Sequence, residues 1–153
     1  MKPLFLGEIR LHETNIIRKQ WQTGALKIAL VYPNQYSAMA GLTIQTLYHL
    51  WNKHQHVICE RFFLPSKEIS DLYPKLPKNQ KFNPTKIIAT KFPPLKSLEN
   101  QMRLKDFDII AFSICFELDY PNILWILDNA KIPFEAKKRH IHQDEVFYPI
   151  IIA

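Results

Sequence analysis

Two carboxylates spaced two positions apart, Glu117 and Asp119, are the side chains of this sequence best suited to acid–base chemistry. Such a pair can donate and accept a proton when the two environments separate their pKa values. Asp119, however, stands just before an apolar-periodic stretch with Pro121 in its first turn, the pattern of a helix N-cap. We therefore favour capping over catalysis for Asp119. The sequence contains no serine–histidine–aspartate arrangement, glycine-rich phosphate loop or metalloprotease helix motif, so we expect no catalysis by this chain alone.

The cysteines and histidines do not form a metal-binding pattern. Cys59 and Cys115 lie far apart in separate apolar stretches, which favours two buried, reduced thiols. Zinc and iron–sulfur sites need three or four Cys or His ligands at short intervals. His54 and His56, like His140 and His142, are two residues apart, which on a helix points them to different faces, although on a strand or loop they could converge. We expect neither a metal site nor an iron–sulfur cluster.

The chain has a net charge of +6 at pH 7, which makes RNA a candidate partner. The basic residues are scattered and lack the interleaved aromatic residues of a base-stacking surface, so a solvated basic surface is the favoured interpretation. No apolar run approaches the roughly 20 residues needed to span a bilayer, and residues 1–10 lack the pattern of a signal peptide. We expect a cytoplasmic protein without a membrane partner.

Two continuous apolar runs, 26–32 and 108–114, predict strands buried on both faces of a sheet. The first run stops at Pro33. Apolar residues at helical spacing over 44–51 predict a helix, and 57–64 predicts a second strand, with Glu60 and Arg61 expected to form an ion pair facing the sheet edge. Strand, helix and strand over this length form one right-handed crossover unit.

The second half of the chain continues the alternation. Asp119 begins a predicted helix that ends before Pro133, and 148–153 predicts a last strand. Residues 66–94 carry five prolines and predict an exposed connection, with a helical turn at 69–73 and a short edge strand at 86–90. The whole pattern predicts an α/β fold with an open, mostly parallel, doubly wound, three-layer sheet of the flavodoxin or Rossmann type, covering 26–153 after a lead-in of 1–25.

Sheets of this type bind ligands beyond the carboxyl ends of the strands, where the strand order reverses. The loops that leave the two central strands, 33–41 and 113–120, therefore form the candidate site. Asn34 and Tyr36 are candidates to contact a ligand, but Pro-Asn is equally ordinary turn chemistry, and an aromatic residue at 36 could simply cover the end of the sheet. Ser113 could bond either a ligand or its own backbone. The candidate binding residues are Pro33, Asn34, Tyr36, Gly41, Ser113, Ile114 and Glu117.

These loops and their flanking segments resemble the amino-terminal cobalamin-binding-like domain of radical S-adenosylmethionine (radical SAM) proteins. The resemblance covers nearly the whole chain and rests on order and spacing as well as on residue types. The segments that carry it are 29–36 (ALVYPNQY), 45–48 (QTLY), 59–65 (CERFFLP), 106–114 (DFDIIAFSI) and 116–120 (FELDY). The resemblance implies a Rossmann-like cobalamin-binding (B12-binding) fold, cobalamin as a cofactor at the candidate site, and a radical SAM core domain or protein as partner.

The sequence departs at two places from that family and at one place from the well-known cobalamin-binding modules. The family continues with two glycines and a barrel that carries a three-cysteine cluster motif, which are absent here, so the resemblance implies an accessory domain, a truncated or split front part of a longer protein, or a stand-alone relative. The well-known cobalamin modules place a cobalt-binding histidine where this chain reads Pro-Asn-Gln-Tyr over 33–36, and the loop 38–43 lacks the family's glycine pattern. The alternative is a non-catalytic interaction module that docks a separate radical SAM enzyme or RNA.

Overall fold

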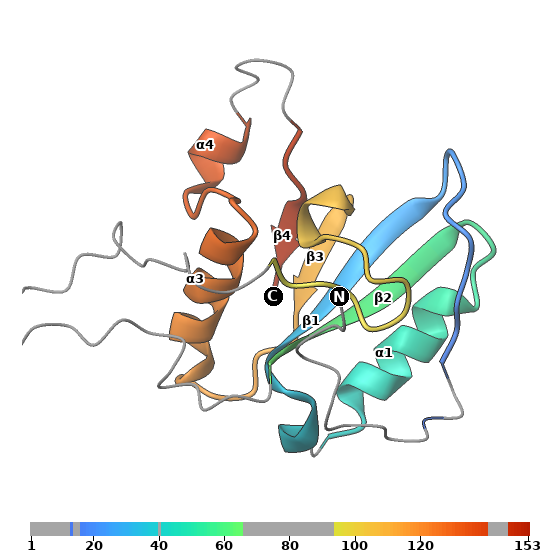
Figure 1. The fold of residues 1–153 in the computed structure, drawn as a ribbon, viewed down its shortest axis with the longest axis horizontal. Coiled ribbons are helices and arrows are strands. Elements are labelled where there is room, and N and C mark those ends of the chain that lie inside the picture. The colour runs from blue at the N-terminus through green and yellow to red at the C-terminus, as the bar shows by residue number, and fades with distance from the viewer. Residues whose placement is uncertain (1–12, 14–15, 40, 66–93, 141–146) are drawn as a thin grey trace, which may run out of the picture.

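A single sheet of four parallel strands forms the centre of the computed structural model, which describes residues 13, 16–39, 41–65, 94–140 and 147–153. The strands are β1 (Leu26–Gln35), β2 (Val57–Leu64), β3 (Ile109–Phe112) and β4 (Ile150–Ile152). Their order across the sheet is β2-β1-β3-β4, and every neighbouring pair is parallel (Figure 1). The order reverses between β1 and β3, the two strands that the continuous apolar runs predicted as central.

Helices cover both faces of this sheet, so the predicted open α/β fold with three layers is confirmed. Helix α1 (Thr43–Asn52) lies on one face, and α3 (Asp119–Asn129) lies on the other (Figure 1). The short helix α4 (Ala136–His140) follows α3, and two 3-10 turns, η1 (Tyr36–Ala38) and η3 (Leu104–Asp106), follow β1 and precede β3. Within the described part of the chain, every helix is too short or too polar to cross a bilayer.

Side chains of β1 alternate between the two faces and so divide the core into two layers. Ile28, Leu30 and Tyr32 pack with Ile44 and Tyr48 of α1. The residues between them pack toward α3, in a larger cluster that includes Ala29, Val31, Phe62, Ile110, Phe112, Trp125 and Ile126. Because a strand buried on both faces has no polar side, β1 reads as a continuous apolar run rather than an alternating one.

Strand β1 runs further than predicted, through Pro33 to Gln35. Its register against β2 shifts between Tyr32 and Gln35, because proline has no N–H to donate to the ladder and the chain must bulge there. Strand β2 has the predicted bounds, 57–64. Strands β3 (Ile109–Phe112) and β4 (Ile150–Ile152) are shorter than the predicted runs 108–114 and 148–153.

Helix α3 ends at Asn129, ahead of Pro133 as predicted. It closes with the two backbone bonds of a Schellman motif, from Ile132 N–H to the Leu127 carbonyl (2.9 Å) and from Lys131 N–H to the Asp128 carbonyl (3.0 Å). Lys131 occupies the left-handed position with φ of +59°. The predicted helical turn at 69–73 and edge strand at 86–90 lie outside the described residues.

Candidate functional site

The loops that leave β1 and β3 emerge at the same edge of the sheet, as predicted. The two strands are adjacent and parallel, and the Ser113 N–H bonds the Val31 carbonyl at 2.9 Å just where β3 ends. In Figure 1, η1 and the connection from β3 to α3 both lie at the lower edge, where α1 and α3 also begin. We call this edge, residues 33–42 and 113–120, the rim.

The polar groups at the β1 end of the rim are bonded to the chain itself. The buried Pro33 carbonyl accepts a hydrogen bond from Asn122 Nδ2 at 2.9 Å, which ties the end of β1 to α3. Asn34 Oδ1 accepts from the Gln35 N–H at 2.8 Å, and the Tyr32 phenol donates to the Ala38 carbonyl at 3.2 Å. Asn34 therefore has the local turn chemistry that was one of its two interpretations.

Asp119 organises the β3 end of the rim, but not as the predicted N-cap. Leu118 occupies the N-cap position without a side-chain cap, and Asp119 is the first residue of α3. Its buried carboxylate reaches back to accept from the N–H groups of Cys115 (3.1 Å) and Phe116 (3.2 Å). Glu117 is exposed, so the two carboxylates have different surroundings, and Asp119 serves to fix the loop.

The remaining predicted residues are only in part accessible. Ser113 and Ile114 are half-buried, and Ile114 packs against the α3-side core. Gly41 is exposed, and a Cβ at that position would meet nothing within 4 Å, so space alone does not require glycine there. Cys59 is buried as predicted, whereas Cys115 is exposed, contrary to prediction, because it lies beyond the end of β3 in the rim loop.

Large apolar side chains are exposed at the rim. Leu42 is 81% exposed, Phe116 63%, Leu118 83% and Tyr120 58%. We call these four residues the rim patch. The rim loops contain no Lys, Arg or His, and Glu117 is an exposed carboxylate among them. A cavity of about 310 Å³ lies elsewhere, between the lead-in and β2, and is lined by Lys19, Gln20, Gln22, Ala25, Gln55 and Ile58.

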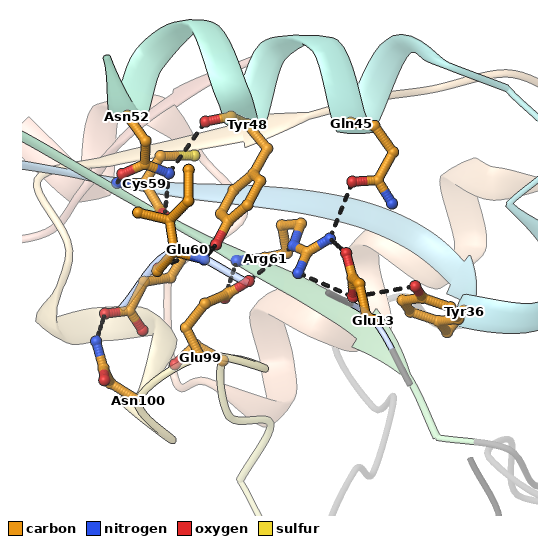
Figure 2. A network of polar contacts seen from close by, with 12 residues as sticks. Glu13, Tyr36, Gln45, Tyr48, Asn52, Cys59, Glu60, Arg61, Glu99 and Asn100 are labelled. Atoms are coloured by element: carbon orange, nitrogen blue, oxygen red, sulfur yellow. Dashed lines mark hydrogen bonds and ion pairs between the residues drawn. The ribbon is translucent and has the colours of Figure 1, made fainter. Parts of the chain in front are cut away.

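A buried polar network that the sequence analysis did not identify lies behind the rim, centred on Arg61 of β2 (Figure 2). Arg61 Nε donates to Glu99 Oε1 at 2.7 Å, and the Arg61 backbone N–H donates to Glu99 Oε2 at 2.7 Å. Its Nη1 donates to Glu13 (2.5 Å) and to Gln45 of α1 (3.1 Å), and its Nη2 donates to Glu13 at 3.2 Å. The guanidinium also lies 4.1 Å from the ring centroid of Tyr48.

Burial alone would lower the pKa of Arg61, but the hydrogen bonds and charges of Glu13 and Glu99 outweigh that effect and raise it. The guanidinium therefore stays charged, with two carboxylates around it. The predicted edge-facing ion pair between Glu60 and Arg61 is wrong, because adjacent strand residues point to opposite faces. Glu60 is buried on the other face, where Oε1 accepts from Trp21 Nε1 and Asn100 Nδ2, both at 2.7 Å.

Residues 43–153 match the family described as radical SAM proteins, N-terminal. The match covers most of the chain, so this protein belongs to that family. It includes β2, β3, β4 and the second rim loop, and it begins where α1 begins. No curated protein and no solved structure matches the chain.

A single signal could have pointed to the Arg61 network. Two charged residues, Glu60 and Arg61, interrupt an otherwise apolar strand, and a buried charge needs a partner. The partners Glu13 and Glu99 lie 48 and 38 residues away in sequence, however, and their identity becomes visible only in the folded chain.

Proposed function

We propose that this chain is a non-catalytic accessory domain of a radical SAM protein and that its rim binds a ligand of the corrinoid class. The observation that carries the proposal is the strand order β2-β1-β3-β4, whose reversal lies between β1 and β3. Open parallel sheets bind ligands at that point. Family membership supports the radical SAM association.

The rim residues fit the face of a corrin ring better than they fit its metal. The rim patch offers exposed apolar and aromatic side chains on which a flat macrocycle can pack. Neither rim loop contains a histidine, so cobalt would have no imidazole ligand from this site. Ser113, Asn34 and Glu117 would be the polar groups that bond amide groups around such a ring.

A bound corrinoid would supply cobalt-centred chemistry that no side chain of this chain provides. The chain's own contribution would be to hold the ring, with Asp119 fixing the loop that carries Phe116 and Leu118. Catalysis by radical SAM chemistry would need three cysteines on one cluster. The sequence has two cysteines in total, so that chemistry would have to come from a radical SAM core.

Titration with hydroxocobalamin tests this proposal, using retention of the cobalamin visible spectrum after gel filtration and a dissociation constant from absorbance changes. Phe116→Ala and Leu118→Ala should each weaken binding by about tenfold, the loss expected when a large apolar contact is removed. Leu50→Ala is the matched control, because Leu50 is 46% exposed on α1 and lies outside the rim. Absence of retained absorbance, or equal losses at Leu50 and Leu118, would overturn the corrinoid assignment.

A second candidate is an interaction module that docks a separate radical SAM enzyme through the same rim. The exposure of all four rim-patch residues at one edge of the sheet favours it, since exposed large apolar side chains are common at interaction sites. Co-elution with a radical SAM enzyme that carries the three-cysteine motif, lost in Leu118→Ala but not in Leu50→Ala, would support it. RNA would have to bind elsewhere because the rim has no basic residue, and a salt-dependent mobility shift with RNA tests for it.

A further inference from the structure

Glu13 makes contacts that the charge of Arg61 does not require. Glu99 is fully buried and already accepts two hydrogen bonds from Arg61, one from Nε and one from the backbone N–H. One carboxylate is enough to balance one guanidinium. Glu13, whose side chain is 13% exposed, adds a second negative charge to the network, and that charge has to be partly removed from water.

Glu13 also connects this network to the rim. Its Oε2 accepts a hydrogen bond from the phenol of Tyr36 at 3.1 Å while the same carboxylate is held by both Nη atoms of Arg61 (Figure 2). Burial and the adjacent Glu13 carboxylate raise the pKa of Tyr36, so the phenol is protonated at neutral pH and can donate. Arg61 is rigidly placed by Glu99, Gln45 and Tyr48, and it provides a fixed anchor for Glu13.

Tyr36 is well placed to transmit this anchoring to the rim loop. It is the first residue of η1, and its carbonyl accepts the Met39 N–H at 3.1 Å, which closes the turn. Its ring packs edge-on against Phe63 of β2, with centroids 4.9 Å apart. With the phenol bonded to Glu13 and the ring against Phe63, the side chain is held at two points, and the backbone of η1 is held with it.

We propose that Glu13 is a positioning residue that uses the buried Arg61 as an anchor to orient Tyr36 and the part of the rim loop that follows it, residues 36–39. The N-terminal lead-in thereby sets the shape of the rim from outside the matched family region. An effect of Glu13 on ligand binding rests on the proposed function of the rim. The structural coupling between Glu13 and the rim loop is independent of that proposed function.

Native-state hydrogen exchange of the full chain tests the coupling directly, with the Met39 amide as the reporter. Glu13→Ala removes the acceptor of the Tyr36 phenol and should accelerate Met39 exchange about two- to tenfold, the effect of losing one intramolecular hydrogen bond. Tyr36→Phe removes only the phenol oxygen and should produce the same acceleration. Because Tyr36→Phe removes a bond that Glu13→Ala has already removed, the double variant should exchange no faster than Glu13→Ala alone. Glu135→Gln, at an exposed surface pair with Lys138, is the control.

A purely structural role for Glu13 gives a different pattern. If Glu13 serves only to balance Arg61, Glu13→Ala lowers the melting temperature while Tyr36→Phe leaves Met39 exchange unchanged, and the proposal is overturned. Additive effects of the two substitutions would overturn it as well. The variants should then be titrated with hydroxocobalamin: weaker binding by both extends the coupling to the ligand. If the variants change Met39 exchange as expected but the protein binds no cobalamin, the corrinoid assignment is refuted and the coupling of Glu13 to the rim loop still stands.

Discussion

Arg61 carries a full positive charge inside the protein. The stability of the fold therefore depends on how completely the guanidinium is hydrogen-bonded. Its side chain has no exposed surface, and hydrogen bonds to Glu13, Gln45 and Glu99 satisfy it, with the face of Tyr48 alongside. Exchanging a buried ion pair for apolar residues can be neutral, but removing one partner leaves an uncompensated charge. Burial of Arg61 therefore costs little folding free energy only while the carboxylates of Glu13 and Glu99 are present.

Arg61→Met should therefore destabilise the domain by about 3–5 kcal/mol, because Glu99 would remain buried without its cation. Urea unfolding followed by tryptophan fluorescence measures the loss, and the three tryptophans of the chain provide the signal. Arg103→Met is the control, since Arg103 forms an ion pair with Asp106 on the surface with 56% of its side chain exposed. Equal unfolding midpoints for the two variants would contradict a structural role for the Arg61 charge.

The contacts of individual polar residues were predicted less accurately from the sequence than the helices and strands. The alternation of a strand places Glu60 and Arg61 on opposite faces, so neighbours in sequence could not pair. Asp119 is of a residue type that often caps helices, yet its carboxylate accepts hydrogen bonds from the loop N–H groups of Cys115 and Phe116 instead. Both of these errors concern polar side chains, whose partners are set by tertiary geometry. Apolar residues of the predicted helix, such as Ile44 and Tyr48, do lie in the core.

Elements were predicted well because their signals are local. Uninterrupted apolar runs gave β1 and β3, helical spacing gave α1, and the bounds of β2 were predicted without error. The ends of elements depend on single residues, and they were less accurate. Pro33 did not end β1 because a bulge accommodates its missing N–H. Similarly, no pattern marked Lys131 as the left-handed residue that closes α3.

Lys131→Gly should stabilise the protein by about 0.5–1 kcal/mol. Left-handed backbone is strained for a residue with a Cβ, and glycine removes that strain at the C′ position of the Schellman motif. Thermal unfolding by circular dichroism measures the change. Lys137→Gly, an exposed position inside α4, should lower stability, because glycine within a helix is unfavourable. A lower melting temperature for Lys131→Gly would show that Lys131 makes contacts worth more than the strain.

For the molecule as a whole, sequence periodicity was enough to predict the parallel sheet and to place the rim. The doubly wound pattern places the two central strands side by side, and their exits then share one edge. Sequence could not show which rim side chains face solvent, because Phe116 and Leu118 have the composition of core residues and their exposure depends on the loop that Asp119 fixes. The same holds for β4, where Ile150 and Ile152 are exposed and Ile151 packs against the core.

The pH dependence of stability should reflect the whole α1-side layer. Burial raises the pKa values of Cys59, Tyr48, Tyr36 and Tyr32 above the ordinary 9.0 of a thiol and 10.0 of a phenol. The folded state therefore keeps these protons at a pH where the unfolded chain has lost them. Stability from these groups is complete below pH 9 and is lost as the pH rises, since the unfolded state then binds fewer protons.

Urea unfolding at intervals from pH 7 to pH 10.5 should show a midpoint that is constant at first and then falls. Each of the two most shifted groups, Cys59 and Tyr48, contributes up to about 1.4 kcal/mol per pH unit once its unfolded form is ionised. Cys59→Val and Tyr48→Phe should each make the alkaline decline shallower, whereas Cys115→Val, at the exposed thiol, should leave it unchanged. Tyr48→Phe will also lower stability at pH 7, because the phenol exchanges hydrogen bonds with both backbone groups of Ile17. The slope above pH 9 is therefore the decisive quantity, and an unaltered slope in both variants would show that protons on this buried layer do not govern the alkaline limit.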